Sequence, residues 1–336
     1  MTRLSRRDAL KRGLLGAAGV AAAGSLGRVA SAAEADAMTH ATDPHAVMTG
    51  GVPAGAAIDP LAFLTDFDYG TVTRGADGRT VREFEVVAVD RTIEVMPGVF
   101  YPAWTYGGRV PGPTFRATEG DLVRVRFVNG GSHDHTIHFH GVHAADMDGV
   151  FEVVPPGGTY IYEFEADPFG LHLYHCHTIP IKKHIAKGLY GAFIIDPRTP
   201  RPPARELVMV MNGFDVNFDG KNEIYAVNTV PFAYQAHPIP IRRNELVRLY
   251  LVNALEFDLL NSLHLHGNFF HVYRTGTSLV PHEFTDTISM GQGERHIIEF
   301  TYRKAGRFMF HAHQSEFTEL GWMGIFDVRD DVEAAE

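Results

Sequence analysis

An internal repeat constrains the fold of this chain more than any other sequence feature. Four motifs occur twice in the same order: a strand-like run ending in Val-Asn, a His-x-His-Gly motif, a second His-x-His motif and a Gly-x-x-Gly motif. The first copies begin at residues 121, 138, 175 and 188, and the second copies begin at residues 245, 264, 311 and 321. Such an ordered series identifies a duplicated structural unit. The proline-rich segment 197–203 separates the copies and is the expected linker.

The repeated unit reads as β-structure. In the run 121–127, Val123, Val125 and Phe127 share one face of a strand while the two arginines share the other. Short β-branched runs punctuated by Gly and Pro continue along the chain, as in β-sandwiches. The sequence therefore predicts an all-β protein with two similar sandwiches, at residues 60–198 and 204–330.

Composition narrows the functional classes. Hydrophobic residues make up 45% and charged residues 21% of the 336 residues, which is ordinary for a packed globular protein. The formal net charge of −10 argues against nucleic acid as a partner, because phosphate recognition needs clustered Lys and Arg. The nineteen histidines point to metal binding.

The N-terminal region predicts export. The Arg6-Arg7 pair is typical of a twin-arginine signal, and Ala30-Ser31-Ala32 resembles a cleavage site. The apolar stretch between them is too short to span a bilayer stably, so no membrane span is expected. We expect a signal peptide at residues 1–32, a flexible leader at 33–57, and a mature protein that is periplasmic or extracellular. The single cysteine, Cys176, excludes an intrachain disulfide.

Four His-x-His pairs carry the strongest chemical signal. Residues i and i+2 of a strand point the same way, so each pair presents two imidazoles on one face. Any one pair is a weak signal, but matching pairs in two repeats predict metal binding. The eight histidines are His138, His140, His175, His177, His264, His266, His311 and His313.

A second set of ligands falls on the opposite face. His135 is an odd number of residues from His138 and His140, and Cys176 lies between His175 and His177. His184, eight residues after Cys176, can fold back from a loop. Two imidazoles and one thiolate form a blue-copper electron-transfer site, whereas zinc usually takes a fourth ligand. Because Cys176 is bonded to both His175 and His177, an electron that arrives at Cys176 is a few covalent bonds from the eight-histidine site.

These motifs resemble those of the small, two-domain, laccase-like multicopper oxidases over about residues 80–328. The resemblance implies two cupredoxin-like Greek-key sandwiches and about four copper ions per chain. Type 1 copper would be held by His135, Cys176 and His184, and type 2 copper by His138 and His264. One type 3 copper would be held by His140, His175 and His313, and the other by His177, His266 and His311. The resemblance also implies a homotrimer with clusters between subunits, dioxygen as acceptor, and a phenol, aromatic amine or metal ion as reductant.

Three departures from the family pattern carry information. Asn261 and Ala312 stand where His135 and Cys176 stand in the first repeat, and no histidine remains near Thr318 or Glu319. Type 1 copper is therefore expected in the N-terminal domain alone. Leu189 occupies the position of the usual axial methionine and cannot coordinate, so we expect a three-coordinate site with a raised potential.

Reduction of dioxygen needs protons, and Asp148 is the candidate acid, although its Asp-Gly context also fits a turn. Asp134 is a weaker candidate, and His143 is a candidate substrate contact. The nearest alternative function is a copper-containing nitrite reductase, which shares the blue site but needs three cluster histidines and has an aspartate where His138 stands. A second alternative is a non-enzymatic copper-binding or electron-carrier protein. That alternative leaves the four histidines of the second repeat without a role.

Overall fold

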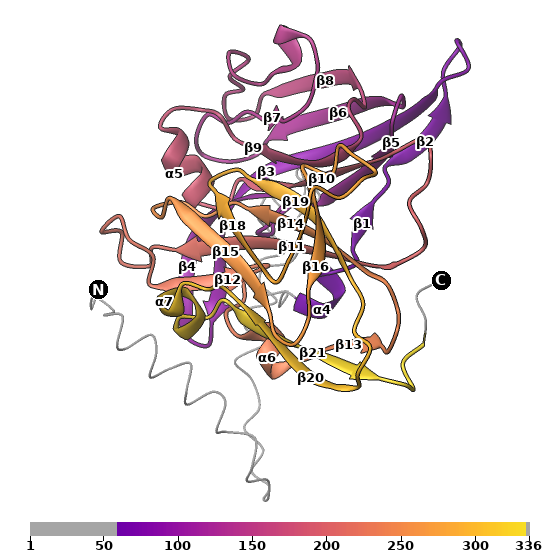
Figure 1. Ribbon diagram of the computed structural model, residues 1–336. Coiled ribbons are helices and arrows are strands. Elements are labelled where there is room, and N and C mark those ends of the chain that lie inside the picture. Colours follow the sequence, from indigo (N-terminus) through magenta and orange to yellow (C-terminus); the bar gives the residue numbers. More distant parts are fainter. Residues whose placement is uncertain (1–58, 334–336) are drawn as a thin grey trace, which may run out of the picture.

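The first repeat forms a sandwich of two sheets in the computed structural model, which describes residues 59–333 (Figure 1). One sheet has the order β1-β5-β10-β9-β7, with bounds Phe67–Asp68, Thr114–Thr118, Tyr190–Asp196, Gly170–His175 and His138–Phe139. The facing sheet has the order β2-β3-β6-β8, with bounds Thr71–Arg74, Thr80–Met96, Leu122–Asn129 and Thr159–Glu165. A further strand, β4 (Val99–Tyr106), pairs with β3.

The second repeat forms another two-sheet sandwich. Its first sheet has the order β12-β11-β14-β19-β16-β17, with bounds Ile224–Val227, Arg205–Phe214, Val247–Asn253, Arg295–Phe300, Phe270–Arg274 and Glu283–Thr285. Its second sheet has the order β13-β21-β20-β15-β18, with bounds Ile239–Arg242, Met323–Arg329, Gly306–His311, Leu260–Leu265 and Thr287–Gly291. The all-β, cupredoxin-like class expected from the sequence is confirmed.

Short helices connect the strands. They are α4 (Pro60–Phe63), the 3-10 helix η2 (Ala145–Met147), α5 (Ile181–Ala186), α6 (Ala233–Ala236) and α7 (Ser315–Glu319). None of the helices within residues 59–333 has the length and apolarity needed to cross a bilayer. The signal peptide and leader expected at residues 1–32 and 33–57 lie outside the described residues.

The four sheets stack, and the two repeats share a buried interface. Figure 1 shows the first repeat, in indigo to magenta, lying against the second, in orange to yellow. Each sandwich has its own core, and a third apolar cluster joins the repeats. In this third cluster, Leu171 and Ile194 of β9 and β10 pack with Val208, Tyr250 and Ile297 of β11, β14 and β19.

This stacking gives the two copies of the first motif different surroundings. Strand β6 alternates between buried and more exposed residues, and its half-buried Arg124 pairs with Glu83 and Glu163. Every residue of the equivalent strand β14 is buried. Its Arg248, the counterpart of Arg124, pairs with Glu299 at 2.7 Å inside the protein. One sequence pattern thus serves an outer sheet in one repeat and an inner sheet in the other.

The last glycine of each Gly-x-x-Gly motif lies beside a strand that carries candidate ligands. Gly191 of β10 pairs with Tyr174 of β9, and Gly324 of β21 pairs with Phe310 of β20. In both places a Cβ on the glycine would lie 2.3 Å from the aromatic side chain. Any larger residue would clash with this ring, which belongs to the strand that leads into the His-x-His motif.

Candidate metal centres

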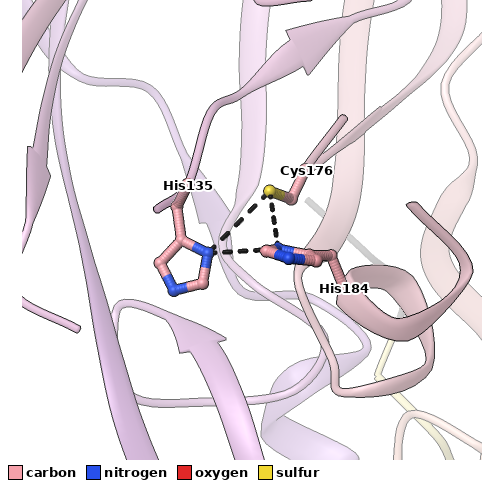
Figure 2. Close-up of side chains that lie close together, drawn as sticks. All are labelled: His135, Cys176 and His184. Carbon is pink, nitrogen blue, oxygen red and sulfur yellow. Dashed lines mark hydrogen bonds between the residues drawn. The ribbon is translucent and has the colours of Figure 1, made fainter. Parts of the chain in front are cut away.

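Three side chains of the first repeat form a compact ligand set, which we term the Cys176 site (Figure 2). The Sγ atom of Cys176 lies 3.2 Å from Nδ1 of His184 and 3.9 Å from Nδ1 of His135. The two Nδ1 atoms are 3.2 Å apart. Bonds of about 2.0 Å to nitrogen and about 2.3 Å to sulfur would separate three trigonal ligands by roughly 3.5–3.7 Å. The observed spacing therefore fits one ion between three ligands.

The Cys176 site is built from three separate segments. Cys176 immediately follows β9, and its N–H donates to the carbonyl of Leu189. His135 forms an isolated bridge with Val154, outside the two-residue strand β7. His135 thus lies outside the regular strand that the parity argument assumes, although its side chain does reach Cys176. His184 lies on the helix α5, so the expectation that it reaches Cys176 from a loop is wrong.

Burial keeps the imidazoles of the Cys176 site neutral. Burial, together with the charge of His184, lowers the pKa of His135 to about 4. Burial, with the charges of His133 and Lys183, lowers the pKa of His184 to about 4. A neutral imidazole is the form that binds a metal. The N–H of Thr136 points at Sγ of Cys176 from 3.4 Å, a contact that stabilises a thiolate.

Four histidines of the first repeat, His138, His140, His175 and His177, gather on the other side of β7 and β9 and form what we term the first histidine cluster. His138 and His175 are paired residues on the two strands. The ring of His138 lies 5.0, 5.1 and 5.3 Å from those of His140, His175 and His177, respectively. The Nε2 atoms of His140 and His175 face each other at 3.2 Å.

The second repeat reproduces this geometry with His264, His266, His311 and His313, the second histidine cluster. His264 pairs with His311 across β15 and β20. The ring of His264 lies 4.9, 5.4 and 5.5 Å from those of His266, His311 and His313, respectively. The Nε2 atoms of His266 and His311 face each other at 2.9 Å. Two half-sites of the same design thus occur in one chain.

Backbone carbonyls set the tautomers of four of these imidazoles. Nδ1 of His138 donates to the carbonyl of Asp148 at 2.7 Å, and Nδ1 of His264 donates to that of Asp286 at 2.9 Å. His175 and His311 donate in the same way to the carbonyl of the next residue. Because Nδ1 carries the proton, Nε2 keeps its lone pair for a metal.

The two clusters do not meet within one chain. Across residues 59–333, the ring contacts of these eight histidines stay inside their own cluster, and the ligand groups that could hold an ion are separate. The grouping into type 2 and type 3 sites, which draws on both repeats, therefore stays a prediction.

The two candidate acids lie at different sites: Asp148 is beside the first histidine cluster, and Asp134 is near the Cys176 site. The carboxylate of Asp148 lies 3.1 Å from Nδ1 of His138 and 3.8 Å from Nε2 of His143. His143 itself donates to the carbonyl of Phe139, so it sits beside Asp148 on the cluster side and not at the Cys176 site. Asp134 is exposed, and its charge acts on His184 of the Cys176 site.

The second repeat fills the place of a Cys176 site with a tryptophan. Trp322 is the counterpart of Leu189, and its backbone carbonyl accepts from the N–H of Ala312 as that of Leu189 does from Cys176. The indole is fully buried, and its Nε1 donates to Oδ1 of Asn261 at 3.0 Å. Asn261 and Ala312 replace His135 and Cys176. Trp322 packs with them, so these positions hold no ligand set like that of the Cys176 site.

Comparison with known proteins decides the family. Sequence signatures described as multicopper oxidase match residues 89–200 and 200–332. The chain belongs to the multicopper oxidase family. Copper is therefore the metal of this oxidoreductase family member, and it suits the nitrogen and sulfur ligands of the Cys176 site and the imidazole clusters.

Relatives of this multicopper oxidase include two functional groups. A crystal structure of a multicopper oxidase is 54% identical, with a TM-score of 0.80, and the match covers 83% of this chain and 100% of that one. A copper nitrite reductase from Nitrosomonas europaea is 28% identical, with a TM-score of 0.70, and the match covers 75% and 95%. The copper-containing nitrite reductase of Neisseria meningitidis (strain Z2491) is 28% identical over 249 residues, which are 67% of this chain and 63% of the relative. This chain thus spans just under two thirds of that curated relative.

Sequence reasoning missed three contributors to the sites of this multicopper oxidase. Trp104 packs its ring 4.8 Å from that of His184 and 5.4 Å from that of His135. Asp286 supplies the carbonyl for His264, and Trp322 fills the lost site. The alignment of Gly-Leu189-Tyr-Gly with Gly-Trp322-Met-Gly is the signal that could have revealed Trp322. No motif marks Trp104, which is on β4.

Proposed function

We propose that this chain is a laccase-like oxidase. The Cys176 site would hold a copper ion that accepts single electrons from a reducing substrate, and the histidine clusters would hold copper ions that supply the chemistry for reducing dioxygen to water. The observation that supports this proposal is the matching geometry of the two four-histidine clusters. A blue site alone serves electron transfer, but eight imidazoles in two equivalent half-sites suit a multinuclear centre. Four electrons and four protons convert one dioxygen to two waters.

The chain offers a short route for electrons. Cys176 is bonded to His175 and His177, which belong to the first histidine cluster. A second connection runs through a hydrogen bond, since Nδ1 of His175 donates to the carbonyl of Cys176 at 3.0 Å. The Cys176 side chain thus links the site where electrons arrive to the imidazoles of the cluster.

Asp148 is proposed to supply protons on the cluster side. Its carboxylate is beside His138 and His143, and its side chain is partly open to solvent. An acid in this position can take a proton from water and deliver it toward the cluster. It also holds His138 in place through both its backbone and its side chain.

We assign the ligands as the family resemblance implies. His138 and His264 would hold type 2 copper. One type 3 ion would be held by His140, His175 and His313. The other would be held by His177, His266 and His311. The short Nε2 contacts of His140 with His175, and of His266 with His311, support two members of each type 3 set. The Cys176 site would hold type 1 copper, with the buried Leu189 leaving its axial position without a ligand.

A homotrimer would complete the cluster. The first histidine cluster of one subunit would face the second cluster of its neighbour, because the two do not meet within a chain. Exposed apolar side chains flank both clusters in sequence: Val142 and Ile179 beside the first, and Leu259 and Phe269 beside the second. Ile179 is 85% exposed in the isolated chain, and apolar groups of this kind mark interaction surfaces.

The alternative function is reduction of nitrite, because two of the three relatives named above are copper-containing nitrite reductases. The test is a copper-loaded preparation assayed for bound copper per chain and for oxygen uptake with a phenol, an aromatic amine and a reduced metal ion. We expect about four coppers per chain and oxygen uptake with release of water. Turnover of nitrite without oxygen consumption would identify a nitrite reductase, and no turnover with any reductant would identify a carrier.

Export of the protein by a twin-arginine signal is part of the same proposal. Fractionation of cells expressing the full chain should place the mature protein outside the cytoplasm. Replacing Arg6 and Arg7 with Lys should retain it inside.

A further inference from the structure

A cavity of about 480 Å³ lies beside the Cys176 site, lined in part by Trp104, His133 and Lys183. Trp104 forms part of its wall, and Phe218 of the second repeat forms another part. Several lining side chains, among them Asp90, Lys183 and Phe218, are exposed, so solvent reaches the cavity.

Trp104 stands between this cavity and the metal ligands. The imidazoles of His135 and His184 are only 1% and 3% exposed, so a molecule in solution cannot touch them directly. The indole ring contacts both imidazoles and also lines the cavity. A donor seated against Trp104 would be separated from the Cys176 site by one aromatic ring.

The cavity is locally cationic although the whole chain has a net charge of −10. Arg91, Lys183 and Lys187 line it together with one carboxylate, that of Asp90. The Asp90 carboxylate already accepts hydrogen bonds from the N–H and hydroxyl of Ser132. The lining therefore favours an anionic group.

Aromatic faces and ammonium groups alternate within the cavity. The Nζ atom of Lys183 lies 5.1 Å from the centre of the Trp104 ring. That of Lys187 lies 4.6 Å from the centre of the Phe218 ring and donates to the carbonyl of Pro102. A flat ring with a charged substituent can contact Trp104 while its anion reaches these lysines.

We propose that this cavity is the electron-donor site and that it selects phenols carrying an anionic group, with the ring against Trp104 and the anion near Lys183 and Lys187. The inference rests on the proposed oxidase function and names its substrate class. Each phenol loses one electron, through Trp104 to the Cys176 site, and releases its phenolic proton to solvent in the open cavity. Four such phenols reduce one dioxygen, which takes up four protons to give two waters.

Three donors with the same phenol ring test the charge preference. Sinapate is anionic, its methyl ester is neutral and its choline ester is cationic. We expect KM for oxygen uptake to rise in that order, by about 3- to 5-fold per step, which is the range of a partly exposed ion pair. Equal KM values for all three would overturn the proposal. Absence of oxygen uptake with the neutral ester would instead contradict the proposed function.

Charge removal locates the preference. Lys183→Gln and Lys187→Gln should each raise KM for sinapate about 3-fold and leave KM for the methyl ester unchanged. Lys182→Gln is the matched control, because this lysine of the same helix lies against Phe257 and does not line the cavity. An unchanged blue absorption band in all variants will show that the neighbouring His184 is still in place. Equal effects on both donors, or an effect of the control, would overturn the assignment.

Binding without turnover provides an independent readout. The ring of 3,4,5-trimethoxycinnamate has no phenolic hydroxyl and cannot be oxidised in the same way. The chain has two tryptophans, and the other, Trp322, is fully buried in the second repeat. We expect the ligand to quench Trp104 fluorescence with a Kd that rises at least about 3-fold in each lysine variant. Quenching that persists in Trp104→Phe would place the ligand elsewhere and overturn the proposal.

Discussion

Replacing Trp322 with Phe tests why the second repeat has no Cys176 site. The indole of Trp322 is fully buried, lies in the core of the second repeat and donates to Asn261. If it fills the space that the ligand set and ion occupy in the first repeat, its loss leaves a cavity and one unmade hydrogen bond.

The size of the effect follows from these two contributions. The hydrogen bond contributes about 1 kcal/mol, and the smaller phenyl ring leaves a cavity that costs about 1–2 kcal/mol. We therefore expect Trp322→Phe to lower the free energy of unfolding by about 2–3 kcal/mol. Trp322→Ala should cost about 3–5 kcal/mol.

Guanidinium unfolding of the copper-free protein, followed by far-ultraviolet circular dichroism, measures the change. Combining Trp322→Phe with Asn261→Ala completes a double-mutant cycle, which should give a coupling of about 1 kcal/mol. Val72→Ala, on an exposed edge strand, is the control and should change stability by less than about 0.5 kcal/mol. Wild-type stability in Trp322→Phe, or zero coupling with Asn261, would refute the idea that the indole fills a lost metal site.

Four further predictions address the sites and the assembly. Cys176→Ser should abolish the blue band and donor oxidation while copper at the clusters remains, as optical and copper-content measurements will show. Asp148→Asn should slow oxygen uptake by about 10- to 100-fold, because Asp148 positions His138, with the blue band unchanged; full activity would exclude that role. Ile179→Glu should give monomers without oxidase activity in light-scattering and oxygen-uptake assays, whereas Ile161→Glu, exposed on β8, should assemble normally. Burial lowers the pKa of His296 to about 4, so the unfolded chain takes up a proton first as pH falls below about 6.5, and stability declines until about pH 4. His296→Phe should remove about 2 kcal/mol of this loss between pH 7 and about pH 4.5, and an unchanged pH dependence of unfolding would contradict it.

The sequence predicted the candidate ligands because the arrangement of their side chains follows from short spacings. His-x-His pairs place two imidazoles on one face of a strand, and Cys176 between two histidines must point the other way. The duplication then indicated that each repeat carries four of the eight paired histidines. Local alternation needs no knowledge of the rest of the chain, so this part of the interpretation did not depend on the fold.

For His135, the local pattern predicted the correct neighbour, Cys176, for the wrong structural reason. Parity along a strand placed it opposite His138, but the residue lies before β7 and is held by its bridge to Val154. His184 reaches Cys176 from the helix α5. In both cases the direction of the side chain is set by contacts with distant segments.

By itself, the sequence determined the duplicated β-architecture and the candidate metal-ligating side chains, since both depend on residues close together in the chain. Tertiary structure alone decided that Trp104 covers the Cys176 site, that Trp322 fills its lost counterpart, and that the cavity is lined by Lys183 and Phe218 from different repeats. The physical reason is that these features arise from packing between segments far apart in sequence. Such packing depends on how the four sheets stack, which no local pattern of residues specifies.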